Sequence, residues 1–428
     1  MGKRTIFILI LAVLAIRLIP AYLIFGSFDM GVWYFFSEKV LEGKNVYTED
    51  LSKVEIIPSQ PGPINAAYTP FWFYLIAGLR YISNAFNLPF YFIVKFPAII
   101  ADIVITLLIY IISLKFGFEK KKSFFISLLY GINPIPILYS SAHGQFDAIA
   151  IMFVLLAAYF FMFKQKKHWS ALFLGFAVVS KNFPIILLPL FLLKLKNWNE
   201  RARYTFLTII PVALILAPFI LISKESFIGV INNVFLYRGG FGYWGYPLSL
   251  IIIKYSPFTL FKVISNSPWF IAIFNEVQRF GNIFTLMAII LSYALIKSDK
   301  IIKSILIIFL TFYTFTIGMG SYLVWVLPFA LLIKDRKIIP YTIFASLYLT
   351  INLLRTESLI GYNGIAHLFN LPYPNMSILK YFQAFFGLIT WAFTLYWLYC
   401  LTLKEIRKKD IGVRRRRKKK KQDLNMAD

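Results

Sequence analysis

The sequence predicts an all-α fold, a polytopic transmembrane helical bundle of about twelve spans. Of the 428 residues, 59% are hydrophobic and only 15% are charged, whereas soluble domains carry about 25% charged residues. Many apolar runs approach the roughly 20 residues that a helix needs to cross a bilayer. These runs do not alternate apolar and polar residues, as the strands of a transmembrane barrel would.

The basic residues predict the orientation of the spans. The net charge is +26, and Lys and Arg cluster in short loops and in the run Arg414–Lys421, as expected for cytoplasmic segments. Lys3 and Arg4 place the N-terminus inside, and the basic run places the C-terminus there too. Residues 1–403 are predicted to form the membrane domain, and 404–428 a cytoplasmic tail that contacts anionic membrane lipid. The expected location is the cell membrane, or the endoplasmic reticulum in a eukaryote, with no nucleic-acid partner.

The first span is predicted near residues 5–25, and it delivers a long loop of residues 26–66 to the outer side. Within this loop, residues 30–41 have the apolar spacing of a helix that lies on the outer membrane surface. Gly43 is expected to end this helix, because glycine readily adopts the left-handed conformation of a helix C-terminus.

The following apolar segment, residues 68–83, is predicted to be interfacial or re-entrant. If it crossed the membrane, Lys120, Lys121 and Lys122 would lie outside, against the charge rule. Further spans are predicted near 89–116, 122–141, 145–163, 204–223, 268–297, 302–318, 321–333, 338–354 and 377–402. A pair of short helices, 168–180 and 182–195, is expected to meet in a turn that lines a protein-enclosed cavity.

Under this topology, seven polar or aromatic candidates share the outer side of the membrane. They are Asp29, His143, Gln145, Asp147, Lys181, Arg238 and Tyr322, the sixth of them in a second long outward region, 224–267. An eighth candidate, Asp102, lies within a predicted span, where an ionisable residue is costly and commonly functional. Lys95 precedes Asp102 by seven positions, so both are expected on one helix face.

Five of these candidates also have a structural interpretation. Asp29 could be a solvated loop carboxylate or a helix cap, and Asp147 could be a favourable charge at a helix N-terminus. Asp102 could hydrogen-bond a neighbour inside the bundle. Lys181 and Arg238 could be ordinary loop charges, although cations on the outer side also suit an anionic ligand such as phosphate.

Several motifs together resemble the GT-C superfamily of polyprenyl-phosphate-sugar-dependent glycosyltransferases, in particular its mannosyltransferase branch. The motifs are Phe28-Asp29 with Trp33-Tyr34 and Gly43-Lys44-Asn45-Val46-Tyr47, Tyr68-Thr69-Pro70, Lys95-Phe96-Pro97 through Asp102, His143-Gly144-Gln145-Phe146-Asp147, Lys181-Asn182-Phe183-Pro184 and Ser321 to Pro328. The resemblance covers roughly residues 1–330. It implies a GT-C-like fold with a long first extracytoplasmic loop.

The resemblance also implies an activity. A hexose, mannose or another, would pass with inversion from a polyprenyl-phosphate donor to a lipid-linked or glycan acceptor. Asp29 would be the catalytic base, Lys181 and Arg238 would hold the donor phosphate, and the substrate would be bound by His143, Gln145, Asp147, Asp102 and Tyr322. The first loop lacks the paired acids of metal-dependent relatives, and the three histidines are scattered, so neither a metal nor another cofactor is expected. The other functions considered are a lipid-linked sugar flippase or transporter and a glycan polymerase or ligase.

Overall fold

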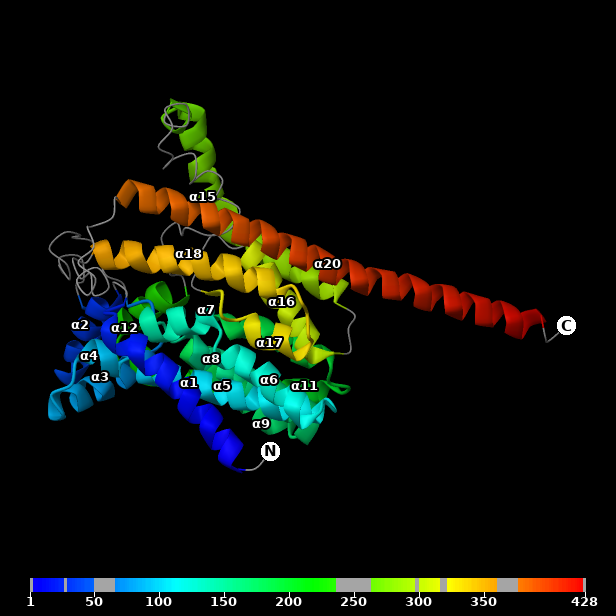
Figure 1. Ribbon diagram of the computed structural model, residues 1–428, viewed down its shortest axis with the longest axis horizontal. Coiled ribbons are helices and arrows are strands. Elements are labelled where there is room, and N and C mark those ends of the chain that lie inside the picture. The colour runs from blue at the N-terminus through cyan, green and yellow to red at the C-terminus, as the bar shows by residue number, and fades with distance from the viewer. Residues whose placement is uncertain are drawn as a thin grey trace.

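The structure is a computed structural model, and it describes residues 3–26, 29–49, 66–235, 263–296, 300–315, 322–359 and 376–425. These residues form a bundle of helices with no strand among them (Figure 1). Arg238, Phe28 and Ser321 lie outside the described residues. The predicted all-α membrane fold is confirmed.

The N-terminal half is built mostly as expected. Its helices are α1 (Lys3–Leu23), α2 (Asp29–Leu41), α3 (Pro70–Ala85), α4 (Phe90–Ile93), α5 (Phe96–Lys115), α6 (Lys120–Gly131), α7 (Pro134–Pro136), the π-helix η1 (Ile137–Ala142), α8 (Asp147–Tyr159) and the π-helix η2 (Phe160–Lys164). Gly43 has a positive φ of 73° just after α2, as predicted for the residue that ends this helix.

The two predicted short helices near 168–180 and 182–195 are also present, and the second of them begins as a 3₁₀ turn. The elements from there on are α9 (Lys167–Ser180), η3 (Phe183–Leu187), α10 (Leu188–Leu193), α11 (Trp198–Ile222), α12 (Lys224–Val230), η4 (Ile231–Phe235), α15 (Pro268–Leu295), α16 (Ile301–Phe315), α17 (Leu327–Leu332), α18 (Ile338–Leu359) and α20 (Met376–Asn425). The helix α20 continues through most of the predicted tail.

Seven helical segments of the described chain are long and apolar enough to cross a membrane, and three shorter apolar helices accompany them. The expected span at 321–333 is not a full helix. There, the six-residue α17 follows a turn that begins at Tyr322. Thirteen residues are too few for a crossing helix, which needs about 17–25, and the turn instead directs Tyr322 and Trp325 into the bundle.

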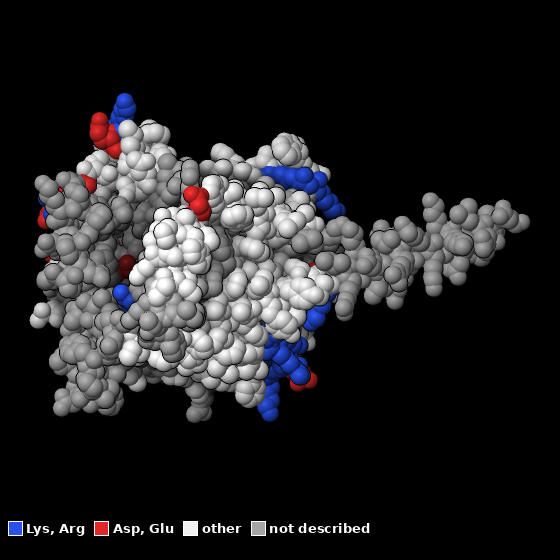
Figure 2. Space-filling model, turned by 90° about the horizontal axis from the view of Figure 1, so that it is seen from above, with Lys and Arg blue, Asp and Glu red and all other residues white. Residues whose placement is uncertain are grey.

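Most of the long helices run side by side, whereas α15 projects away from them, and several short helices gather at one end of the bundle (Figure 1). In Figure 1, α2, α3, α4 and α12 lie at the end opposite to the projecting C-terminal part of α20. Figure 2 shows large groups of Lys and Arg side chains at the end from which that helix projects. Many of the basic residues that cluster in short loops of the sequence therefore gather at this one end of the bundle.

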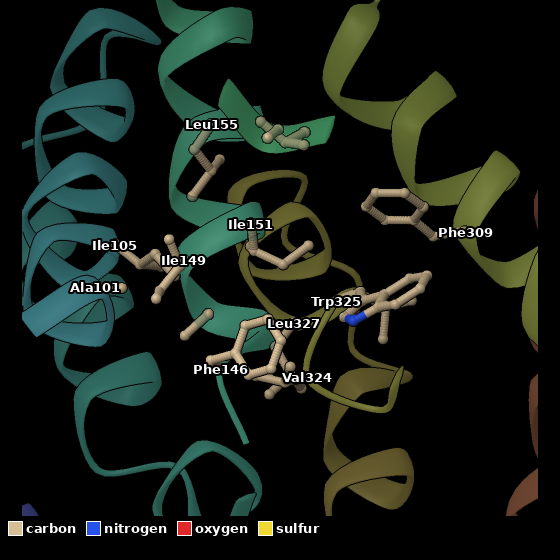
Figure 3. Close-up of a cluster of buried hydrophobic side chains, with 14 of the residues drawn as sticks. Ala101, Ile105, Phe146, Ile149, Ile151, Leu155, Phe309, Val324, Trp325 and Leu327 are labelled. Carbon is tan, nitrogen blue, oxygen red and sulfur yellow. The ribbon is translucent and has the colours of Figure 1, made fainter. Parts of the chain in front are cut away.

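The core lies where α5, α8, α16 and α17 meet. Figure 3 shows Phe146 beside Val324 and Leu327, Ile149 beside Ile105 of α5, and Trp325 beside Phe309. Their side chains are almost completely removed from solvent. This packing joins the start of α8 to the turn before α17.

Two polar contacts join α1 to α5. Arg17 Nε lies 3.3 Å from Asp102 Oδ2, and both side chains are fully buried. Lys95 Nζ donates to the carbonyl oxygens of Ala21, at 3.0 Å, and Ile24, at 2.5 Å. Lys95 and Asp102 thus face the same helix, as their spacing predicted. Together they set where α1 ends and where the chain turns towards α2.

Candidate active site

The site is built on the turn of residues 143–147 between η1 and α8. Two glycines with positive φ allow the segment after α1 to approach this turn. Gly26, in that segment, has a φ of 119°, and Gly144, in the turn, has a φ of 86°. A Cβ added to Gly26 would lie 2.8 Å from the His143 carbonyl oxygen, and one added to Gly144 would collide with the side chain of Met30. This close approach brings the start of α2 onto the turn.

Asp29 is the first residue of α2 and is half-buried. Gln145 Nε2 donates a hydrogen bond to Asp29 Oδ2. Gln145 itself is only 7% exposed, and its backbone N–H donates to the Tyr139 carbonyl oxygen at 3.0 Å. A buried, backbone-anchored amide therefore orients the Asp29 carboxylate.

Two residues further on, Asp147 is completely buried and accepts three hydrogen bonds. Its Oδ2 accepts from Lys181 Nζ at 2.6 Å and from Tyr139 Oη at 3.1 Å. Its Oδ1 accepts from Trp325 Nε1 at 2.8 Å. Three donors compensate for removing the carboxylate from water, and they come from three separate parts of the chain.

Lys181 follows α9 and keeps 20% of its side chain exposed. Its Nζ lies 5.1 Å from the centre of the Phe146 ring and 5.5 Å from that of Tyr322. Both distances are within the range of cation–π attraction. The ammonium group is therefore held between a buried carboxylate and two aromatic rings, while a fifth of the Lys181 side chain stays exposed.

Aromatic side chains pack against Phe146 of the 143–147 turn. Phe146 stacks on Trp72 with 3.7 Å between ring centres, and Trp33 and Tyr68 contact the Phe146 ring at its edge or at a tilt. Trp33 comes from α2, Tyr68 from the segment just before α3, and Trp72 from α3. The motifs containing these aromatics are thus brought together around the turn.

His143 lies on the side of the turn that faces α18. Its Nε2 is 3.5 Å from Asn352 Nδ2, and Asn352 Oδ1 accepts from Gln383 of α20 at 2.6 Å. Burial and the nearby Lys95 ammonium lower the pKa of His143 from 6.5 to about 4. The imidazole is therefore neutral at physiological pH and can accept a hydrogen bond.

The structure brings together Asp29, Gln145, Asp147, Lys181 and Tyr322, and it brings His143 to the edge of this group. Asp102 is placed elsewhere, in the pair with Arg17, and it also accepts a hydrogen bond from Tyr130 at 2.7 Å. Asp102 therefore hydrogen-bonds neighbours inside the bundle, as its structural interpretation predicted.

Several residues of these networks were not among the predicted candidates, Arg17, Tyr139 and Trp325 among them. A cation inside the first apolar span was a signal for Arg17. Trp325 stood in the motif that ends at Pro328, but nothing in its spacing identified the indole as a donor to Asp147. Within the described residues, no group of three or more His, Cys, Asp or Glu side chains is arranged to hold a metal ion.

Comparisons with known proteins bear on this site. Residues 67–246 match the model of glycosyltransferase family 87. This segment includes the 143–147 turn and Lys181 but begins after Asp29. The match confirms the resemblance to membrane glycosyltransferases that the motifs predicted.

A curated relative and a solved structure are also similar to the chain. GPI mannosyltransferase 1 of Candida albicans is 27% identical over 123 residues, which are 28% of this chain and 29% of the relative. The chain therefore matches less than a third of that relative's length. The crystal structure of ArnT from Cupriavidus metallidurans bound to undecaprenyl phosphate has a TM-score of 0.43 and 13% identity, and the match covers 94% of this chain and 78% of that one.

Proposed function

We propose that this protein is a glycosyltransferase that moves a hexose, mannose in the first instance, from a polyprenyl-phosphate donor to a lipid-linked or glycan acceptor on the extracytoplasmic face. The observation that carries the proposal is the grouping of Asp29 with Lys181. The 143–147 turn bonds Asp29 through Gln145 and Lys181 through Asp147. A carboxylate and an ammonium group are thereby bonded to side chains of the same turn.

Asp29 is suited to be the general base. The attacking acceptor hydroxyl forms a bond to the anomeric carbon while its proton passes to the Asp29 carboxylate. The bond from the anomeric carbon to the phosphate oxygen breaks, and its electron pair leaves with the polyprenyl phosphate. Attack on the face opposite to the leaving group inverts the anomeric centre.

Lys181 is suited to stabilise the leaving group, on which negative charge grows as the bond breaks. Asp147 fixes the ammonium group in position and accepts three protein donors, which leaves it little capacity for a sugar hydroxyl. Its role in this proposal is therefore to position Lys181. Arg238, which was predicted to share the phosphate, lies outside the described residues.

The test is transfer by the purified full-length protein from a panel of radiolabelled polyprenyl-phosphate sugars, the mannosyl and glucosyl compounds included. We expect Asp29→Asn to lower the transfer rate by about 10²- to 10⁴-fold, because the amide cannot accept the proton. Glu42→Gln is the matched control, since Glu42 is an exposed carboxylate just beyond α2, and it should transfer normally.

Full activity of a folded Asp29→Asn protein would remove Asp29 from the mechanism. If the labelled donor crosses the membrane of vesicles that contain the protein and no new glycosidic bond forms, the protein is a transporter instead.

A further inference from the structure

A groove of about 610 Å³ lies between α2 and the corner that joins α3 to α4, and we call it the α2–α3 groove. Met30 and Gly31, the two residues that follow Asp29, line it. Arg80, Asn84 and Asn87 from the α3 side line it as well. Its volume is in the range typical of small-molecule sites, about 300–1,000 Å³. The groove thus runs along the face of α2 that carries Gly31, Tyr34 and Glu38, and this face begins two residues after Asp29 in the chain.

Two opposite charges in the groove offset one another. Arg80 Nη2 lies 3.4 Å from Glu38 Oε1, and the same nitrogen donates to Tyr34 Oη. The Arg80 guanidinium carbon also lies 3.9 Å from the centre of the Tyr34 ring. Because Glu38 neutralises Arg80 and would repel a phosphate, the groove is poorly suited to an anion.

The other lining groups suit a ligand rich in hydroxyls. Asn84 and Asn87 are exposed at the corner after α3, and each amide offers two donors and an acceptor. Tyr34 is 38% exposed and Phe90 packs against its ring at 5.7 Å. An aromatic face next to amides and a carboxylate can pack against the C–H face of a sugar while the polar groups bind its hydroxyls.

We propose that the α2–α3 groove binds the neutral saccharide part of the acceptor, one or two sugars away from the hydroxyl that reacts at Asp29. This inference rests on the proposed glycosyltransferase function. It adds the class of acceptor: the part next to the reacting hydroxyl is a neutral glycan, not a phosphorylated or otherwise anionic head group. It also assigns Glu38, Asn84 and Asn87 as specificity residues.

The test measures binding separately from transfer. Saturation-transfer NMR is recorded on the full-length protein in phosphatidylcholine nanodiscs, with methyl α-mannoside, mannobiose and maltose as neutral probes and inorganic phosphate as the anionic competitor. The groove variants are Asn84→Ala and Glu38→Gln. The matched control is Asn199→Ala, because Asn199 is an exposed asparagine of α11 that does not line the groove.

We expect at least one saccharide to bind the unmodified protein, with its Kd raised about five-fold in each groove variant, as for the loss of one hydrogen bond. Asn199→Ala should leave the Kd unchanged, and phosphate should not displace the saccharide. Absence of saccharide binding, equal affinity in the groove variants, or displacement by phosphate would each overturn the inference.

Failure of the proposed function has a different signature, namely sugar transfer that survives Asp29→Asn. Asp29→Asn should bind the saccharide as the unmodified protein does, because its side chain is not needed for the groove contacts. Saccharide binding in the groove is thus judged without reference to catalysis.

Discussion

At the scale of single residues, Asp147 makes the most demanding contacts of the site. It is completely buried and is bonded by Lys181, Tyr139 and Trp325. A buried carboxylate without such donors would be strongly destabilising. The three bonds also fix the positions of their donors, so one side chain holds the turn of residues 143–147 against α9 and against the segment before α17.

We expect Asp147→Asn to lower the free energy of unfolding by about 3 kcal/mol, at the low end for a broken buried pair, because Lys181 is still partly exposed. Thermal unfolding in detergent measures the change. The double variant Asp147→Asn with Lys181→Met should be more stable than the sum of the two single effects implies, because it leaves no unpaired charge. Strictly additive effects would contradict the pairing.

At the scale of elements, the position of Asp29 depends on how α1 is fixed. Arg17 pairs with Asp102 of α5, and Lys95 bonds two carbonyl oxygens at the end of α1. The chain then turns at Gly26 into α2. The position of Asp29 therefore depends on contacts of α1 with buried residues that have no direct part in the proposed chemistry.

We expect Arg17→Met to destabilise the protein by about 3–5 kcal/mol, because it leaves the Asp102 carboxylate buried without its counter-charge. The double variant Arg17→Met with Asp102→Leu should recover much of the loss, since two apolar side chains can replace a buried ion pair. The measurements are the monodisperse yield in size-exclusion chromatography and the midpoint of thermal unfolding. If Arg17→Met alone is as stable as the unmodified protein, the pair does not anchor α1.

At the scale of the whole molecule, the two predicted outward regions meet. Asn45 Nδ2 donates to Ser226 Oγ at 2.8 Å, and a Cβ added to Gly229 would collide with the backbone of Tyr47. Tyr47 Oη in turn donates to the Tyr68 carbonyl oxygen at 2.7 Å. The short helices α2, α3 and α12 thus form one cap over the end of the bundle that carries the candidate site (Figure 1).

We expect this cap and the basic tail to lie on opposite sides of the membrane, with the cap outside. Replacing the single cysteine by Cys400→Ser gives a background for labelling with a membrane-impermeant maleimide. In intact cells, Glu42→Cys should react at once, and Lys420→Cys should react only after the membrane is permeabilised. The reverse pattern would invert the topology and place the proposed chemistry inside.

The sequence alone was enough to predict most of the helices, and its charge pattern predicts their direction across the membrane. Long apolar runs have few ways to satisfy their backbone groups in lipid other than as helices, and this made α1, α5 and α11 predictable. Spacing and charge also predicted a helix after the first span, the short pair α9 and α10, and a set of polar candidates on one side of the membrane. The segment 321–333 was read wrongly, because a short apolar run has the same pattern whether it crosses the membrane or forms a turn and a single helical turn inside the bundle.

Only the tertiary structure decided which candidates share a site. It joined Asp29 to Gln145 and Lys181 to Asp147, and it put Asp102 in a separate pair with Arg17. Hydrogen-bond partners that are 34, 85 and 116 positions apart, as in these three pairs, leave no periodic signal along the chain. A carboxylate also looks the same in a sequence whether its donors come from protein or from a substrate, and only the packing of the surrounding helices distinguishes the two.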